Sequence, residues 1–152
     1  MTETTMQKAA TTKLLATFVL HDALCAFDAA RVQEVIRMGP VTAVRHAPEE
    51  VTGVINLRGR IVTLLDLGRI LGFAKTEPNR DSRIFIIEDR GDFIGLLVDR
   101  AADVMELDPA AEERVPANLS LEQKRYIRGV QRAADGRVIA LLDLGALLPA
   151  AQ

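Results

Sequence analysis

The stretch GVINLRGRIVTLLDLGRILG, from Gly53 to Gly72, decides the fold of this chain. Its two apolar runs, Val54–Leu57 and Ile61–Leu65, are rich in β-branched residues and flank Gly59, so they predict two strands joined by a turn. Arg69–Gly72 then predicts a short helical turn that a glycine terminates.

The same pattern returns near the other end of the chain. Gly136–Pro149 reads GRVIALLDLGALLP, against GRIVTLLDLGRILG at Gly59–Gly72, and Leu-Leu-Asp-Leu-Gly recurs in register. Gly53–Val54 before the first copy matches Gly129–Val130 before the second. The chain therefore consists of two related halves, and any proposed function must be compatible with this duplication.

Each half also begins with a predicted hairpin. Leu14–Leu20 and Leu24–Phe27 are apolar runs on either side of a short turn. Arg83–Glu88 and Phe93–Val98 repeat this arrangement. Counting in this way gives about five short strands in each half, a number that usually closes into a small barrel because open edges invite aggregation. We therefore expect a mostly β fold of two small five-stranded barrels with a few short helices.

The segments between these strands carry weaker signals. From them we predict a turn at Asp28–Ala30 followed by a strand, a short strand at Val41–Val44, a helical turn at Pro48–Val51, a helix start at Asp108–Pro109, and helix formers at Leu119–Tyr126 behind a cap at Ser120.

The polar segment Ala74–Ser82 has loop composition and separates the halves, residues 14–75 and 83–148. We expect residues 14–150 to form one domain, whose halves either exchange strands or stay separate. Residues 1–13 are rich in Thr, Glu and Gln and lack the apolar core of a signal peptide, so a disordered leader is expected.

Composition excludes several classes of protein. The 152 residues carry a net charge of −2 and no Trp, so neither the basic field nor the aromatic platform of a nucleic-acid binder is present. Cys25 is alone, which rules out an internal disulfide and favours the cytosol. No apolar run approaches the ~20 residues that cross a bilayer, so direct membrane insertion is not expected.

The duplicated Asp66 and Asp143 suggest two interpretations. A two-fold pair of Asp-x-Gly loops is how aspartic proteases bring two carboxylates together to share a proton. Alternatively, each aspartate caps the helical turn that follows it. Both copies carry Leu where a protease needs a small hydroxyl residue, which favours capping and leaves a duplicated-Asp hydrolase as a remote alternative.

His21 and His46 are too few and too far apart for a metal-site pattern, and Cys25 is the only thiol. We expect both histidines to be exposed, and we expect no metal or cofactor.

Two charged residues interrupt apolar stretches. Glu34 lies inside Val-Gln-Glu-Val-Ile and Arg58 follows Val-Ile-Asn-Leu. Charges beside apolar surface are seldom unpaired, so we predict a Glu34–Arg58 ion pair. Such a pair either only tethers two strands or forms the charged rim of a binding groove.

Three motifs in order, AFDAARVQEVIRM, APEEVTGVINLRGRIVTLLDLGRILG and FIGLLVDRAADVMEL, make the chain resemble the CheW-like domain of bacterial chemotaxis. The resemblance covers Leu14 to Leu148. It implies two five-stranded barrels resembling SH3 domains that share an apolar core. It also implies a non-catalytic adaptor or scaffold, since family members are not enzymes.

The resemblance further implies partners. Such adaptors couple the cytoplasmic tip of a methyl-accepting chemoreceptor to the regulatory domain of the histidine kinase CheA, and the receptor's helical hairpin docks in a groove between the barrels. A cytoplasmic protein that is monomeric in isolation is expected. An adaptor of a different pathway, such as twitching or gliding motility, second-messenger control or development, would share the same fold and groove.

The family's motif positions imply a receptor-binding groove in this chain. Its residues are Val32, Ile84 and Val104 as groove contacts, Gly53 and Gly95 as positions that keep backbone space, and Glu34 with Arg58 as the charged pair. Ordinary core packing is the alternative for the three apolar residues. The kinase-facing surface is not assigned to residues, and because the second repeat lies close to Gln152, any longer C-terminal helix of relatives is expected to be absent or reduced.

Overall fold

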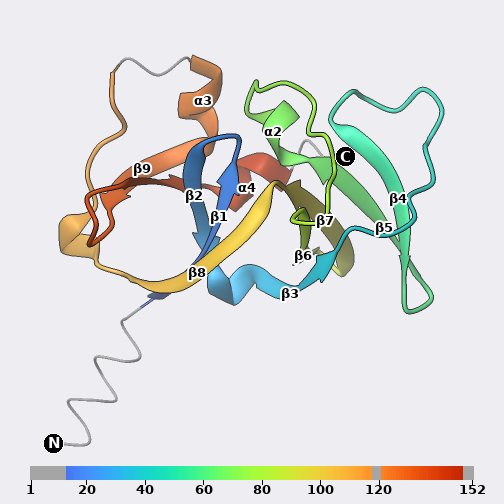
Figure 1. The fold of residues 1–152 in the computed structure, drawn as a ribbon, viewed down its shortest axis with the longest axis horizontal. Coiled ribbons are helices and arrows are strands. Elements are labelled where there is room, and N and C mark those ends of the chain that lie inside the picture. The colour runs from blue at the N-terminus through green and yellow to red at the C-terminus, as the bar shows by residue number, and fades with distance from the viewer. Residues whose placement is uncertain (1–12, 118–120, 149–152) are drawn as a thin grey trace, which may run out of the picture.

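The computed structural model describes residues 13–117 and 121–148 and is mostly β (Figure 1). Each half of the sequence supplies five strands. Those of the first half are β1 (Lys13–Leu20), β2 (Ala23–Asp28), β3 (Val32–Arg37), β4 (Val51–Leu57) and β5 (Arg60–Asp66). Those of the second half are β6 (Arg83–Asp89), β7 (Asp92–Val98), β8 (Arg100–Leu107), β9 (Ile127–Arg132) and β10 (Val138–Leu142).

The helical elements in the described residues are all short. They are η1 (Ala29–Arg31), α2 (Leu67–Ile70), η2 (Pro109–Ala111), α3 (Leu121–Tyr126) and α4 (Leu144–Leu147). A mostly β chain with two five-stranded sheets and a few short helices confirms the predicted fold class.

The strands form two sheets that do not follow the two halves of the sequence. One sheet has the order β8-β1-β2-β10-β9 and the other the order β3-β6-β7-β5-β4. Each half thus gives its first hairpin to one sheet and its last three strands to the other. The parallel pairs β2–β10 and β5–β7 join strands from different halves. The halves therefore exchange strands, which is one of the two arrangements that the sequence left open.

Neither sheet is a closed barrel, but a single bridge spans the open edges of each. Thr42, after β3, bridges Val54 on the opposite edge strand β4. Glu113, after β8, bridges Val130 on the opposite edge strand β9. The bridge positions Val54 and Val130 directly follow the equivalent glycines Gly53 and Gly129. The duplication therefore includes the bridge that spans the open edges of each sheet.

The local signals explain most of the turns. Asp28 caps η1, in the segment where a turn was predicted, by accepting a hydrogen bond from the amide of Ala30 at 3.0 Å. Asp108 caps η2 in the same way, as predicted. Gly72 follows α2 with φ of 90°, the left-handed conformation in which glycine commonly terminates a helix.

The largest core cluster lies between the two sheets. It contains side chains from both, including the three buried rings Phe18, Phe27 and Phe85, which contact one another at centroid distances of 4.6 to 6.1 Å. A smaller cluster fills the interior of each sheet. In Figure 1 one sheet lies on the left and the other on the right of this shared core.

Three of the smaller predictions need comment. The strand predicted at Val41–Val44 was wrong, because only Thr42 makes a bridge there. Pro48–Val51 makes one turn, closed by the amide of Val51 and the carbonyl of Pro48 at 3.0 Å, before β4 begins. The proposed cap Ser120 and residues 1–12 of the expected leader lie outside the described residues, whereas Lys13 begins β1.

Candidate partner-binding surface

Glu34 and Arg58 form the ion pair that the sequence predicted. The guanidinium of Arg58 donates to both carboxylate oxygens of Glu34, from Nη1 to Oε2 at 3.4 Å and from Nη2 to Oε1. This hydrogen bonding, with the added charge attraction, raises the pKa of Arg58 above its ordinary value. The pair stays accessible, because the Glu34 side chain is 32% exposed and that of Arg58 is 71% exposed.

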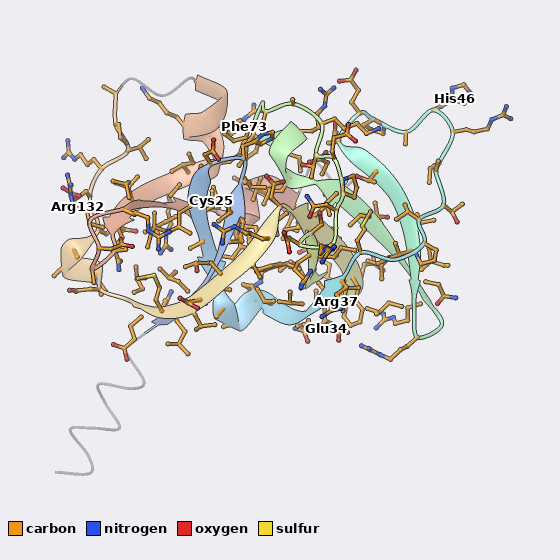
Figure 2. The ribbon with its side chains drawn as sticks, in the orientation of Figure 1. Cys25, Glu34, Arg37, His46, Phe73 and Arg132 are labelled. Carbon is orange, nitrogen blue, oxygen red and sulfur yellow. The ribbon has the colours of Figure 1, made fainter. Side chains whose placement is uncertain are left out.

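The two residues reach each other from opposite edges of their sheet. Glu34 lies on edge strand β3, at the lower edge of the molecule in Figure 2. Arg58 lies in the two-residue turn between β4 and β5, where Arg58 and Gly59 have φ of 49° and 86°, as a tight hairpin turn requires. The pair therefore joins β3 to the β4–β5 hairpin and presents charge at the surface, which is compatible with both predicted roles.

Val104 is an exposed apolar side chain. It lies on edge strand β8 and is 62% exposed. Leu14, on the neighbouring strand β1, is 49% exposed and lies on the same face, because β1 pairs Leu14 with Glu106 and Ala16 with Val104. The sequence analysis treated Leu14 only as part of a strand. Its place at the strand end, before the buried run begins, was the available signal.

Val32 occupies an intermediate position. It is the first residue of β3, is half-buried and packs against the shared core cluster. It therefore contributes to core packing while part of its side chain remains accessible.

Ile84 does not lie at the surface. It is 0% exposed on β6 and belongs to the cluster inside its own sheet, with Leu64 and Ile86. Gly95 lies directly beside it: a Cβ added at Gly95 would be 2.8 Å from Cγ2 of Ile84. Core packing, the alternative named for Ile84, thus describes this residue, and Gly95 provides the room that the Ile84 side chain needs.

Gly53 also has a structural reason to be glycine. A Cβ at this buried position would lie 2.4 Å from the carbonyl oxygen of Thr42 and 2.7 Å from Cγ1 of Val41. These atoms belong to the segment that bridges β4, so only a residue without a side chain permits the bridge. The groove position inferred for Gly53 is a requirement of the sheet edge.

Both repeated aspartates act as helix caps, which confirms the capping interpretation. Oδ1 of Asp66 accepts from the amide of Arg69 at 3.3 Å, and Oδ1 of Asp143 accepts from the amide of Ala146 at 3.3 Å. Asp66 is also buried and bonded to Thr76, a partner that the sequence analysis did not identify.

The two histidines are exposed, as expected. His46 lies on the loop between β3 and β4, which projects from the molecule in Figure 2. His21 packs against Phe73 with ring centroids 4.9 Å apart. Within residues 13–117 and 121–148, the structure shows no group of three or more side chains that would suit a metal ion.

Comparisons with known proteins agree with this architecture. The profile of the CheW-like domain family matches residues 15–152. The chain belongs to the CheW-like domain family. A solved structure with a similar fold is the scaffolding protein TtCheW from Thermoanaerobacter tengcongensis, with a TM-score of 0.77, 31% sequence identity, and coverage of 87% of this chain and 84% of that chain.

Curated relatives of the CheW-like chain are named as chemotaxis proteins. A probable chemotaxis protein CheW from Rhizobium etli is 34% identical over 76% of this chain and 74% of its own length. CheW from Rhizobium meliloti is 33% identical over 78% of this chain and 76% of its own length. CheW from Thermotoga maritima is 31% identical over 86% of this chain and 84% of its own length. The family and these names place the chain among the chemotaxis scaffolds. In the described part of the chain, each helix is too short or too polar to cross a membrane.

Proposed function

We propose that this chain is a non-catalytic adaptor that couples the cytoplasmic tip of a chemoreceptor to a CheA-type histidine kinase. Membership of the CheW-like family supports this role. The observation that carries it is the accessible Glu34–Arg58 ion pair, at positions where the resemblance to the family implies a charged pair. In this proposal the protein works in the cytoplasm, is monomeric in isolation, and joins receptor arrays at the inner membrane only with its partners.

The contact surface for the receptor consists of Glu34, Arg58, Val104 and the accessible part of Val32. An amphipathic helical hairpin needs an apolar contact and a polar edge, and these residues offer both types of side chain. Gly53, Ile84 and Gly95 support the proposed surface from inside, because they set the backbone spacing of β4, β6 and β7. The carboxylates of Asp66 and Asp143 serve as caps in this proposal and have no catalytic role.

The test is reconstitution of the full chain with a purified receptor cytoplasmic fragment and a CheA-type kinase from the same organism. Co-sedimentation and kinase activity are measured for the wild type, Arg58→Glu, Glu34→Arg and the double variant. We expect each single variant to weaken receptor binding at least tenfold. Recovery in the double variant would show that Glu34 and Arg58 act through their ion pair.

Arg132→Glu is the matched control for Arg58→Glu. Arg132 forms a comparably exposed ion pair with Glu113, at 3.2 Å. Figure 2 shows Arg132 at the left edge of the molecule, apart from Glu34 at the lower edge. We expect this control to bind the receptor normally. Equal loss in Arg132→Glu would mean that net charge and not this surface matters, and wild-type protein that binds neither receptor nor kinase would refute the proposal.

A further inference from the structure

A cavity of about 560 Å³ opens at one end of the β8-β1-β2-β10-β9 sheet, and none of the residues proposed to meet the receptor lines it. This volume falls within the ~300–1,000 Å³ typical of small-molecule sites. Its walls come from the β1–β2 hairpin, the segment after α2, and strands β9 and β10. The larger apolar side chains that line it include Leu24, Phe73, Ile127, Val130, Val138 and Leu142.

Small side chains create the space. Ala23, Cys25 and Ala140 line the cavity, and Ala140 is the partner of Cys25 in the parallel pairing of β10 with β2. Burial raises the pKa of the Cys25 thiol to about 12, so this part of the wall is uncharged at neutral pH. The cavity therefore has an apolar interior.

The other sheet is built by the same repeat but differs at the corresponding end. Its parallel pairing sets Thr63 against Ile94, the counterparts of Ala140 and Cys25. There the guanidinium of Arg60 lies over the ring of Phe93, 4.1 Å from its centroid. A cation on an aromatic face is a stable arrangement and occupies this end of the sheet.

In the cavity-bearing sheet, Arg137 takes the repeat position of Arg60, because Gly136-Arg137 matches Gly59-Arg60. Arg137 has no ring to cover. It instead pairs with Asp135 at 2.7 Å and contributes to the cavity wall. The cavity is thus a specific difference between two halves that otherwise share their pattern.

The charged groups at the cavity favour an anion. Arg100, at the start of β8, lines it, and the guanidinium of Arg100 makes no hydrogen bond or ion pair with any described residue. Arg137 is the second cation, and Asp22 is the one carboxylate among the lining residues, beside His21. An arginine without an acidic partner next to an apolar cavity suits a carboxylate attached to an apolar body.

We propose that this cavity binds a small amphipathic anion, with its apolar chain against the walls from β2, β9 and β10 and its carboxylate at Arg100. The site is separate from the Glu34–Arg58 surface and does not depend on the adaptor function.

The test uses dodecanoate, below its micelle-forming concentration, titrated calorimetrically into the full chain. We expect saturable binding of one molecule per chain. Ala140→Phe, which fills the cavity, should weaken binding at least tenfold, whereas Ala43→Phe, the same change on an exposed loop, should leave it unchanged. Val138→Trp fills the cavity from a side chain that is 48% exposed, and it replaces Ala140→Phe if that variant fails to fold.

The head group is tested separately. Arg100→Glu should weaken dodecanoate binding about tenfold or more while leaving the affinity for dodecan-1-ol unchanged, and Arg45→Glu on an exposed loop is its matched control. Absence of saturable binding, or binding that both filling variants leave intact, would overturn the proposal. So would equal affinity for the dodecyltrimethylammonium cation. If dodecanoate fails but the filling variants block a purified kinase regulatory domain, the cavity is a protein-docking site and the proposal is wrong.

Discussion

The two copies of Leu-Leu-Asp-Leu-Gly have one sequence but two environments. Asp66 is only 3% exposed, whereas Asp143 is exposed at the surface. Both accept one amide hydrogen bond from the following helix at 3.3 Å. Asp66 accepts two more from Thr76, from its amide at 2.8 Å and from its hydroxyl at 2.8 Å. The motif therefore specifies the helix cap in both copies. The segment that carries Thr76 decides how much the aspartate contributes to stability.

Thr76 belongs to the connection between the halves, which follows α2 and returns over it. The amide of Phe73 donates to the carbonyl of Gly68 at 2.8 Å, which turns the chain back toward Asp66. Thr76 is itself buried, so the Asp66–Thr76 contact fastens this connection to the core. In the first copy the aspartate is thus a junction between two segments, while in the second it serves its helix alone.

The largest expected loss of stability comes from removing the carboxylate of Asp66. Asp66→Ala should lower the free energy of unfolding by about 3 kcal/mol, because it leaves the buried amide and hydroxyl of Thr76 without an acceptor. Urea denaturation measures the loss. A loss as small as that of an exposed cap would show that the connection does not depend on Asp66.

Thr76→Ala tests the same contact from the other side. It removes the hydroxyl but keeps the hydrogen bond from the Thr76 amide to Asp66, so we expect the free energy of unfolding to fall by about 1.5 kcal/mol. A double-mutant cycle with Asp66→Ala should give a coupling energy of about 1 kcal/mol, since the residues are in direct contact. Additive losses would separate the two residues energetically.

Asp143→Ala removes the corresponding cap in the second copy. The expected loss is about 1 kcal/mol, the usual value for an N-cap aspartate with no further partner. Asp143→Asn should recover most of it, because asparagine caps nearly as well. Urea denaturation under the same conditions measures both losses. A loss equal to that of Asp66→Ala would contradict the expectation that Asp66 stabilises the fold more than Asp143 does.

Substituting the glycine of each motif, Gly68 or Gly145, should give the smallest difference in stability between the two copies. A Cβ at Gly68 would lie 3.2 Å from the Thr76 hydroxyl and 3.4 Å from Oδ1 of Asp66, whereas one at Gly145 would approach only Oδ1 of Asp143, at 3.2 Å. We expect Gly68→Ala to cost about 1 kcal/mol through crowding, and Gly145→Ala to change stability by less than about 0.5 kcal/mol because helix propensity offsets the contact. Melting temperatures compare the two, and equal effects would mean that the connection adapts.

Much of the local structure could be predicted from the sequence. The hairpins, the turn at Arg58–Gly59 and the caps at Asp28, Asp66 and Asp143 depend on residues close together in the chain. The Glu34–Arg58 pair was predicted as well, because two charges in apolar stretches need partners. Whether Ile84 lies in the groove or in the core was left open, since an apolar residue in a strand carries no sign of which face of the sheet is covered.

The sequence by itself determined the duplication, the ten strands and the short-range turns and caps, because hydrogen bonding within a few residues and alternating burial leave a direct pattern in the residue order. Only the tertiary structure decided that the halves exchange their hairpins and that Thr76 covers Asp66 while Asp143 stays exposed. It also decided that Arg60 lies over Phe93 whereas Arg137 lines a cavity. These features depend on contacts between segments far apart in the chain, and identical motifs do not distinguish among the ways in which two equivalent halves can pack.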